Sequence, residues 1–156
     1  MTEGMVPVRA LFEGHLFVGD LTRAMAFYSD VLGLELAHRV SGRRVAFYWI
    51  GGRGEAMLGL WEAGPDCDGL SLHLAFNTTL DDLLQAPALL KRAGVTPRDF
   101  SGNPIDEPVV LAWMPAASVY FHDPDGNLLE FLSMLPDPPE PSLGVVGWSR
   151  WLRRPA

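Results

Sequence analysis

Two successive stretches of this chain have the same order of predicted secondary structure, and a repeat of that kind constrains the fold before any single motif does. In the first stretch, Asp20 is expected to cap a helix over residues 21–32, and Gly33 is expected to end it. Alternating apolar residues predict four strands, over residues 11–18, 34–39, 44–50 and 56–62. The predicted order is therefore β-α-β-β-β.

The second stretch repeats this order with one extended or irregular insertion. Its helix is expected over residues 80–93 and is closed by Gly94, and Pro87 should kink it or split it into two. The predicted strands cover residues 70–76, 95–100, 109–114, 118–122 and 128–134. A duplicated unit with its own sheet is expected to close its apolar face against the other unit.

A carboxylate occurs in the last of these strands. Asp123-Pro124-Asp125-Gly126 has strong turn chemistry, so the flanking apolar runs predict a β-hairpin. Glu130 lies in the second run, whose two faces are both largely apolar. A carboxylate is costly there unless a metal, a basic partner or solvent in a cavity compensates its charge.

The overall charge limits the class of partner. The 156 residues include 12 basic and 19 acidic side chains, for a formal net charge of −7. This balance argues against nucleic acid or an anionic membrane as partner and favours a neutral or cationic ligand. We find neither a signal-peptide pattern nor an apolar run long enough to span a membrane, so a cytoplasmic location is expected.

Three motifs occur in an order that resembles the vicinal oxygen chelate superfamily, which includes glyoxalase I, extradiol dioxygenases, fosfomycin-resistance thiol transferases and bleomycin-binding proteins. They are Val18-Gly19-Asp20-Leu21 with Ala26-Phe27-Tyr28 and Val31-Leu32-Gly33-Leu34, then Leu72-His73-Leu74-Ala75-Phe76, and then Asp123-Pro124-Asp125-Gly126 with Leu129-Glu130. The resemblance covers roughly residues 8–134 and leaves the reaction open.

The resemblance implies an α+β fold in which two βαβββ modules form a cup-shaped, partly open mixed β-sheet barrel with flanking helices. We expect a single domain over residues 1–156, with one module at about residues 8–64 and the other at about 69–134. A Pro-rich linker and C-terminal tail would occupy residues 135–156. That tail could dock on its own domain, dock on a dimer mate or cover the cavity.

The resemblance also implies a divalent metal ion held on the concave side of the cup. His73 and Glu130 match the ligands of the second module. In the first module the family register falls on Glu13, whereas His15 is chemically more attractive, and both lie on one strand face. The fourth ligand position falls at Gly59, which cannot bind metal. Manganese, iron, zinc and nickel all remain open.

Four residues are expected to contact a substrate. Ser118 and Tyr120 form a Ser-x-Tyr pattern that resembles substrate-contacting positions in fosfomycin-resistance transferases, and Tyr120 could also act as a catalytic hydroxyl. Phe17 and Trp61 are among the strand aromatics that would line the cup.

These observations leave two classes of function open. One is a metal-dependent lyase, transferase or dioxygenase acting on a small organic substrate with vicinal oxygens. The other is a non-catalytic protein that binds a drug or metabolite, like the bleomycin-binding relatives. A homodimer is expected in either case, because the superfamily is commonly dimeric.

Overall fold

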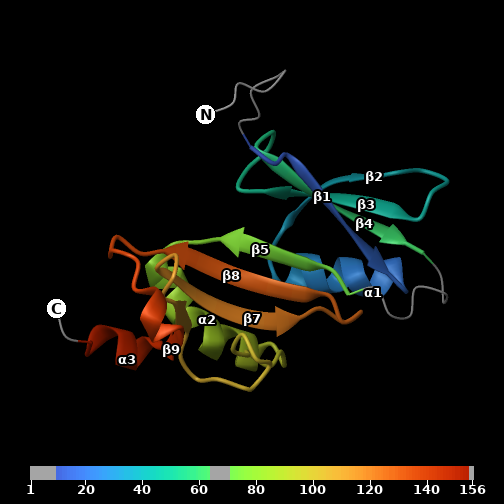
Figure 1. Cartoon of the computed structure of the whole chain (residues 1–156). Helices are drawn as coiled ribbons and strands as arrows, with labels where there is room; N and C mark the ends of the chain where they lie inside the picture. The colour runs from blue at the N-terminus through green and yellow to red at the C-terminus, as the bar shows by residue number, and fades with distance from the viewer. Residues whose placement is uncertain (1–9, 64–70, 155–156) are drawn as a thin grey trace. The chain divides into compact units, whose positions relative to one another are not determined.

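The computed structural model describes residues 10–63 and 71–154, which divide into two compact units, one within Met1–Leu70 and the other within Ser71–Ala156 (Figure 1). The strands of the described residues form one sheet in each unit, of four and five strands. The fold is thus mixed α+β with two sheets that are not closed, as expected. The expected strand start at residue 70 and the expected module limits at 8, 64 and 69 lie outside the described residues.

The sheet of the first unit has the strand order β1-β4-β3-β2. The chain leaves β1 through a helix and returns to its neighbour in parallel, whereas β2, β3 and β4 follow one another as antiparallel strands. The bounds are β1 Glu13–Val18, β2 Glu35–Arg39, β3 Val45–Ile50 and β4 Ala56–Glu62. The predicted β-α-β-β-β order is confirmed for this unit.

One side of this sheet is covered by helix and the other is more open. The expected continuous helix is instead α1 (Leu21–Ala26) followed by a π-helical segment, η1 (Phe27–Val31), in which Leu32 N–H donates to the Phe27 carbonyl. Asp20 caps α1 by accepting from the Arg23 N–H at 3.0 Å, as predicted. Buried side chains of the sheet face this helix, namely Leu16, Val18, Ala46, Tyr48, Leu58 and Leu60. Because strand residues alternate, Glu13, His15 and Phe17 lie on the opposite side.

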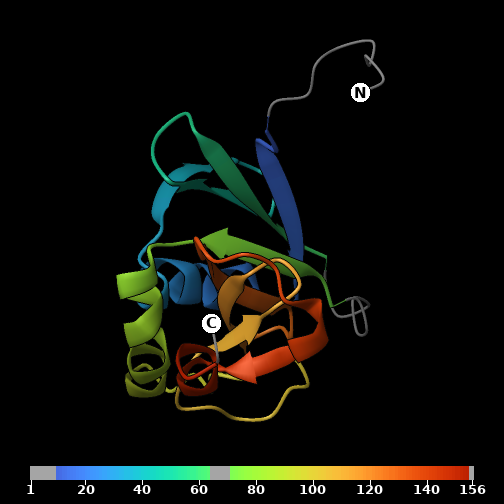
Figure 2. The same ribbon diagram turned by 60° about the vertical axis from the view of Figure 1, so that its left-hand side comes forward.

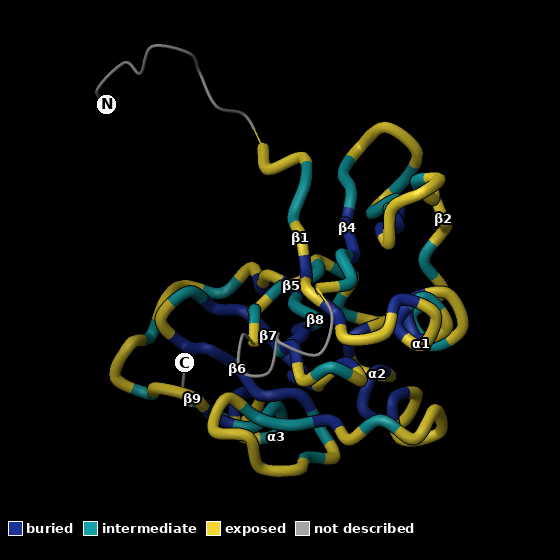
Figure 3. The backbone as a smooth tube through the Cα atoms, turned by 90° about the vertical axis from the view of Figure 1, so that its right-hand side faces the viewer, coloured by how far each residue is buried: buried dark blue, intermediate teal, exposed yellow. Residues whose placement is uncertain are grey.

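The sheet of the second unit has the order β5-β8-β7-β6-β9. Its strands are β5 His73–Asn77, β6 Val109–Leu111, β7 Ala116–His122, β8 Leu128–Met134 and β9 Val145–Gly147. Strands β7 and β8 form the expected hairpin, whose turn places Gly126 at φ 84°. Every residue of β7 except His122 is buried, so this strand lies at the centre of the unit (Figure 3).

Helix α2 (Leu80–Arg92) packs on β7 and β8 through its buried face. Of the two effects expected of Pro87, a kink or a split, the split does not occur. Pro87 lies inside one continuous helix, where it is buried together with Leu83, Ala86 and Leu90. Proline has no backbone N–H and so removes one helical hydrogen bond. Packing of this apolar face against the sheet offsets the free-energy cost of that loss.

Residues 95–100 do not form the strand that their apolar pattern predicts. Arg98 makes isolated bridges to Tyr120 and to Pro104, and the chain then turns around Asp99, whose side chain accepts from the N–H groups of Ser101 and Asn103. Backbone N–H groups that donate to the Asp99 side chain cannot also donate to a neighbouring strand, so a regular β-ladder does not form. The neighbouring strand β6 is also shorter than expected, ending at Leu111 instead of residue 114.

The C-terminal tail docks on its own unit. Strand β9 pairs antiparallel with β6 and so extends the sheet by one strand. Helix α3 (Trp148–Leu152) follows directly (Figure 2). Glu107 accepts from both the backbone N–H and the hydroxyl of Ser149 in the first turn of this helix. The Trp151 side chain is only 1% exposed. Of the three roles considered for the tail, this one is found.

Among the described residues, no helix has the length and apolar character that crossing a membrane requires.

Candidate metal and substrate site

The second unit brings His73 and Glu130 together. Strand β5 pairs in parallel with β8 so that Ala75 lies opposite Glu130, which places His73 on the same side of the sheet, two residues along. Nε2 of His73 is 3.0 Å from Oε2 of Glu130. The Glu130 side chain is only 4% exposed, whereas the His73 side chain is 48% exposed. A buried carboxylate thus faces an accessible imidazole.

Two hydroxyl side chains of β7 lie beside the Glu130 carboxylate. Ser118 donates to Oε1 of Glu130 at 2.6 Å and is itself fully buried. Tyr120 lies directly opposite Glu130 in the β7–β8 ladder. Burial, together with the nearby Glu130 charge, raises the pKa of the Tyr120 hydroxyl above its ordinary value. Both residues were expected to contact substrate, and the structure places them against Glu130.

Neighbouring ligand atoms held about 2.0–2.2 Å from an ion lie roughly 2.8–3.6 Å apart in octahedral or tetrahedral geometry. The 3.0 Å separation of His73 Nε2 and Glu130 Oε2 is therefore compatible with one shared divalent cation. An imidazole and a carboxylate also suit manganese, iron, zinc and nickel. The two ligands expected from the second unit, His73 and Glu130, are thus close enough to bind one ion.

The first unit brings Glu13 and His15 together. Nε2 of His15 is 3.1 Å from Oε1 of Glu13, and Nδ1 of His15 accepts from the indole N–H of Trp61 at 2.7 Å. Across residues 10–63 and 71–154, no three histidine, cysteine or acidic side chains form one cluster suited to a metal. The four candidate ligands instead occur as two pairs, one in each unit.

Aromatic side chains surround His15 on the open side of the first sheet. The β1–β4 and β3–β4 registers place Phe17 opposite Trp61 and Phe47 opposite Gly59. The rings of Phe47 and Trp61 both meet His15 edge-on, with centroid distances of 6.2 and 5.8 Å. Phe17 is 38% exposed, and the indole N–H of Trp61 is engaged by His15.

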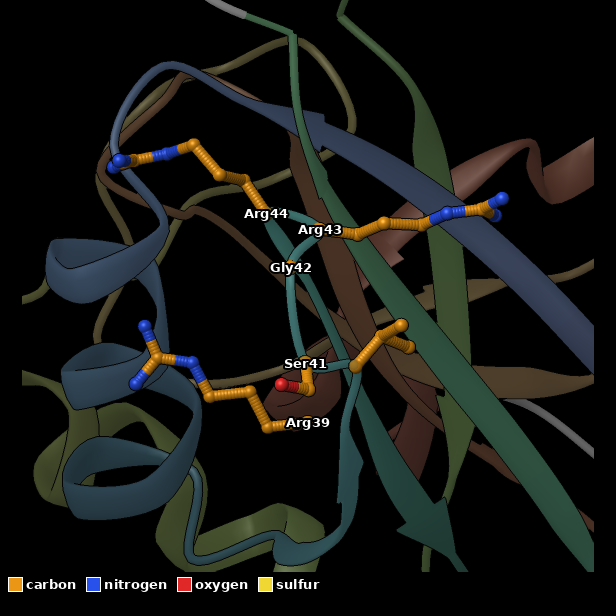
Figure 4. Close-up of a pocket in the computed structure, with 6 residues that line it drawn as sticks. Arg39, Ser41, Gly42, Arg43 and Arg44 are labelled. Carbon is orange, nitrogen blue, oxygen red and sulfur yellow. The ribbon is translucent and has the colours of Figure 1, made fainter.

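A separate hollow lies at the β2–β3 turn and is lined by residues 39–44, three of which are arginines (Figure 4). These arginines do not converge on one point, because Arg43 extends to the side opposite from Arg39 and Arg44. Arg44 is also bound to the Glu62 carboxylate through its guanidinium. This arrangement does not form a single anion-binding site.

Two residues near the candidate site were not predicted. The Phe100 ring packs edge-on against the Tyr120 ring, with the centroids 6.0 Å apart, and Phe100 is 67% exposed. This contact was not foreseen because residues 95–100 were expected to form a regular strand. Phe47 contacts His15 from a neighbouring strand. Its alternation with Trp49 was the available signal, because strand residues two apart lie on one side.

The sequence of residues 9–131 matches the family model of the Glyoxalase/Bleomycin resistance protein/Dioxygenase superfamily. This chain belongs to that superfamily. The expected resemblance is therefore confirmed, over most of the region where the three motifs occur.

Several solved structures share the fold of this chain. An integron cassette protein from the mobile metagenome of the Halifax Harbour sewage outfall is 31% identical, with a TM-score of 0.71 over 81% of this chain and 100% of its own. A lactoylglutathione lyase from Agrobacterium tumefaciens is 23% identical, with a TM-score of 0.63 over 82% of this chain and 96% of its own. A superfamily protein from Nocardioides is 21% identical, with a TM-score of 0.62 over 86% and 89% of the two chains.

Proposed function

We propose that this superfamily member is a divalent-metal-dependent enzyme of the glyoxalase or dioxygenase type, acting on a small organic substrate with vicinal oxygens. The His73–Glu130 pair is the main support. A protein that only bound an apolar ligand would have no need for a buried carboxylate beside an accessible imidazole, and such a carboxylate is costly without compensation. Glu13 or His15 of the first unit would supply a further ligand.

A metal held there would act as a Lewis acid on the substrate oxygens. The protein side chains would set the geometry around it. Ser118 holds one oxygen of Glu130 and leaves the other directed at His73. A tyrosine hydroxyl is ordinarily protonated at neutral pH, and burial raises the pKa of Tyr120 further, so Tyr120 is suited to donate a hydrogen bond.

Without metal, the 3.0 Å contact between His73 and Glu130 requires a hydrogen on Nε2 of the imidazole. Metal binding at this nitrogen would require its lone pair, so the neutral ring would have to carry its hydrogen on Nδ1 instead. Loading of the site would therefore be coupled to a change of the His73 tautomer.

Metal content tests this proposal directly. Protein purified without an affinity tag is incubated with Mn²⁺, Fe²⁺, Zn²⁺ or Ni²⁺, desalted and subjected to elemental analysis. We expect about one equivalent of one of these metals in the wild type and a large loss in His73→Ala and Glu130→Ala, since each removes one of few ligands. His122→Ala is the matched control, because His122 is an exposed histidine at the end of β7. Failure of the wild type to retain any metal would contradict the proposal.

The open aromatic side of the first sheet supports a second candidate, a protein that binds a drug or metabolite without chemistry. Phe17, Phe47 and Trp61 lie near one another there, and aromatic rings commonly line organic-ligand sites. The net charge of −7 suits a cationic ligand such as bleomycin. Quenching of tryptophan fluorescence by metal-free bleomycin, lost in Trp61→Phe, would favour this candidate over the enzyme if no metal is retained.

Two further expectations accompany either function. We propose that the protein is a homodimer in the cytoplasm and that its ligand is a small molecule, not nucleic acid or a membrane. Light scattering coupled to size-exclusion chromatography measures the oligomeric state. A measured mass of 17.1 kDa, which is the mass of one chain, would contradict the homodimer.

A further inference from the structure

A glycine in β4 makes room for the His15 ring. A Cβ atom built at Gly59 would lie 2.4 Å from Nδ1 and 2.9 Å from Cε1 of His15, and 3.1 Å from Cε1 of Phe47. Real Cβ atoms essentially never come within 3.0 Å of a neighbouring heavy atom, so the two His15 contacts would not be tolerated, and the Phe47 contact would be tight. The imidazole therefore occupies the space that any larger residue at position 59 would need, directly above the Gly59 backbone.

Trp61 determines which nitrogen of His15 carries the hydrogen. The indole Nε1–H is a donor only, and it points at Nδ1 of His15 at a distance of 2.7 Å. Nδ1 must then accept with its lone pair, so the neutral ring carries its hydrogen on Nε2. That nitrogen lies 3.1 Å from Oε1 of Glu13. Hydrogen bonds thus run in one direction, from Trp61 to His15 and from His15 to Glu13.

We propose that His15 is a positioning residue and not a metal ligand: Trp61 holds it over Gly59 as the Nε2–H tautomer, and it orients Glu13, which is the ligand of the first unit. The role of Glu13 rests on the proposed metal-dependent function. The tautomer of His15 does not, because it follows from the Trp61 contact alone.

The competing assignment conflicts with this arrangement. Coordination through Nε2 of His15 would require the ring hydrogen on Nδ1, where it would point at the hydrogen of the Trp61 indole. Coordination through Nδ1 would require Trp61 to leave. Glu13 has no such conflict, and carboxylate ligands are commonly held by hydrogen bonds from neighbouring side chains.

The tautomer can be measured on metal-free protein. Long-range ¹⁵N–¹H correlation spectra at about pH 8, where an ordinary histidine is neutral, distinguish the two ring nitrogens. We expect an unprotonated Nδ1 and a protonated Nε2 for His15, and a shift toward a tautomer mixture in Trp61→Phe, which removes the donor. Gly59→Ala should produce the same shift by displacing the ring. A protonated Nδ1 in the wild type would overturn the proposal.

Metal titration by calorimetry, with Mn²⁺ as the probe, tests the role of each side chain. Glu13→Gln removes a charged ligand, so it should weaken binding at least as much as loss of an outer hydrogen bond to a ligand does, which is about 10-fold to 100-fold. His15→Gln keeps an N–H₂ group that can donate to Glu13, so its affinity should stay within about 3-fold of the wild type. His15→Leu has no donor and should lose about 10-fold or more.

The outcomes separate this inference from the proposed function. A His15→Gln variant that loses affinity as strongly as His73→Ala would identify His15 as a ligand and overturn the inference. A wild type that binds no Mn²⁺, Fe²⁺, Zn²⁺ or Ni²⁺ would contradict the proposed function and the ligand role of Glu13. The spectra of the metal-free protein then still decide whether Trp61 fixes the tautomer of His15.

Discussion

The fully buried hydroxyl of Ser118 donates to Oε1 of Glu130 at 2.6 Å, while Oε2 of the same carboxylate faces His73 at 3.0 Å. The two oxygens of Glu130 therefore have different partners. One is held by a buried hydroxyl, and the other faces an imidazole that is 48% exposed.

Replacing Ser118 with alanine should therefore weaken metal binding without removing a ligand. Outer hydrogen bonds to metal ligands are typically worth about 10-fold to 100-fold in affinity, and we expect a loss of that size for Mn²⁺ in Ser118→Ala. Ser133→Ala is the matched control, because Ser133 is also a buried serine of this hairpin but lies opposite Ala117. Equal affinities of Ser118→Ala and the wild type in calorimetric titrations would contradict this role.

The docked tail should contribute strongly to stability. Trp151 is 1% exposed and its ring also stacks with the Arg154 guanidinium, 3.5 Å from the ring centroid. Truncation of a buried tryptophan typically costs about 3–5 kcal/mol, so Trp151→Ala should lower the free energy of unfolding by that amount. The neighbouring Leu152 is 62% exposed, and Leu152→Ala should change it by less than about 0.5 kcal/mol. Denaturant titrations compare the two variants.

An acidic residue at the end of β4 should make stability depend on pH. Glu62 binds the Arg44 guanidinium and accepts from the Leu21 N–H at 2.8 Å, and these bonds hold the pKa of its carboxyl below the ordinary value. A carboxyl whose pKa is lower when folded stabilises the protein above its unfolded pKa of about 4.3 and loses that contribution as pH falls through the folded pKa.

Glu62→Gln should therefore be less stable than the wild type at pH 7, and the difference should narrow as the pH falls below about 4.3. Urea unfolding of both proteins at a series of pH values measures this difference. A gap that stayed constant down to acid pH would show that Glu62 acts through packing and not through its charge.

The hairpin turn depends on one buried aspartate. Oδ1 of Asp123 accepts from the backbone N–H groups of Asp125 and Asn127, both at 2.9 Å, and Oδ2 accepts from the Asn127 side chain. Asp123→Ala leaves these donors unsatisfied and should cost about 2 kcal/mol or more. Asp123→Asn retains one acceptor oxygen and should lose less, and thermal unfolding followed by circular dichroism ranks the variants. The opposite ranking would contradict this account.

Local chemistry made most of the first unit predictable. The Asp20 cap and the Gly33 stop define the start and end of the helical segment, and Gly33 indeed has φ 67°. Alternation then gives the strands and the shared face of Glu13 and His15. The π-helical register of η1 was not predictable in this way, because its residues carry the same amphipathic pattern as an ordinary helix.

Contacts between distant segments account for the rest. Strand β9 is three residues long and pairs with a strand more than 30 residues earlier, so its sequence alone does not identify a partner. The bond between Trp61 and His15 likewise depends on the β1–β4 register, which sets His15 opposite Gly59. Gly59 was recognised as unable to bind metal, but its effect on the neighbouring ring appears only when the strands are paired.

The pairing of β9 with β6 has a consequence for solubility. A sheet that ended at β6 would present a row of unused backbone donors and acceptors, and such edges recruit strands from other molecules. Strand β9 occupies this edge with a segment too short to serve as a good template, and the α3 helix turns the chain away directly after it. The tail thus acts as a built-in guard against self-association through this edge, independently of whatever the site binds.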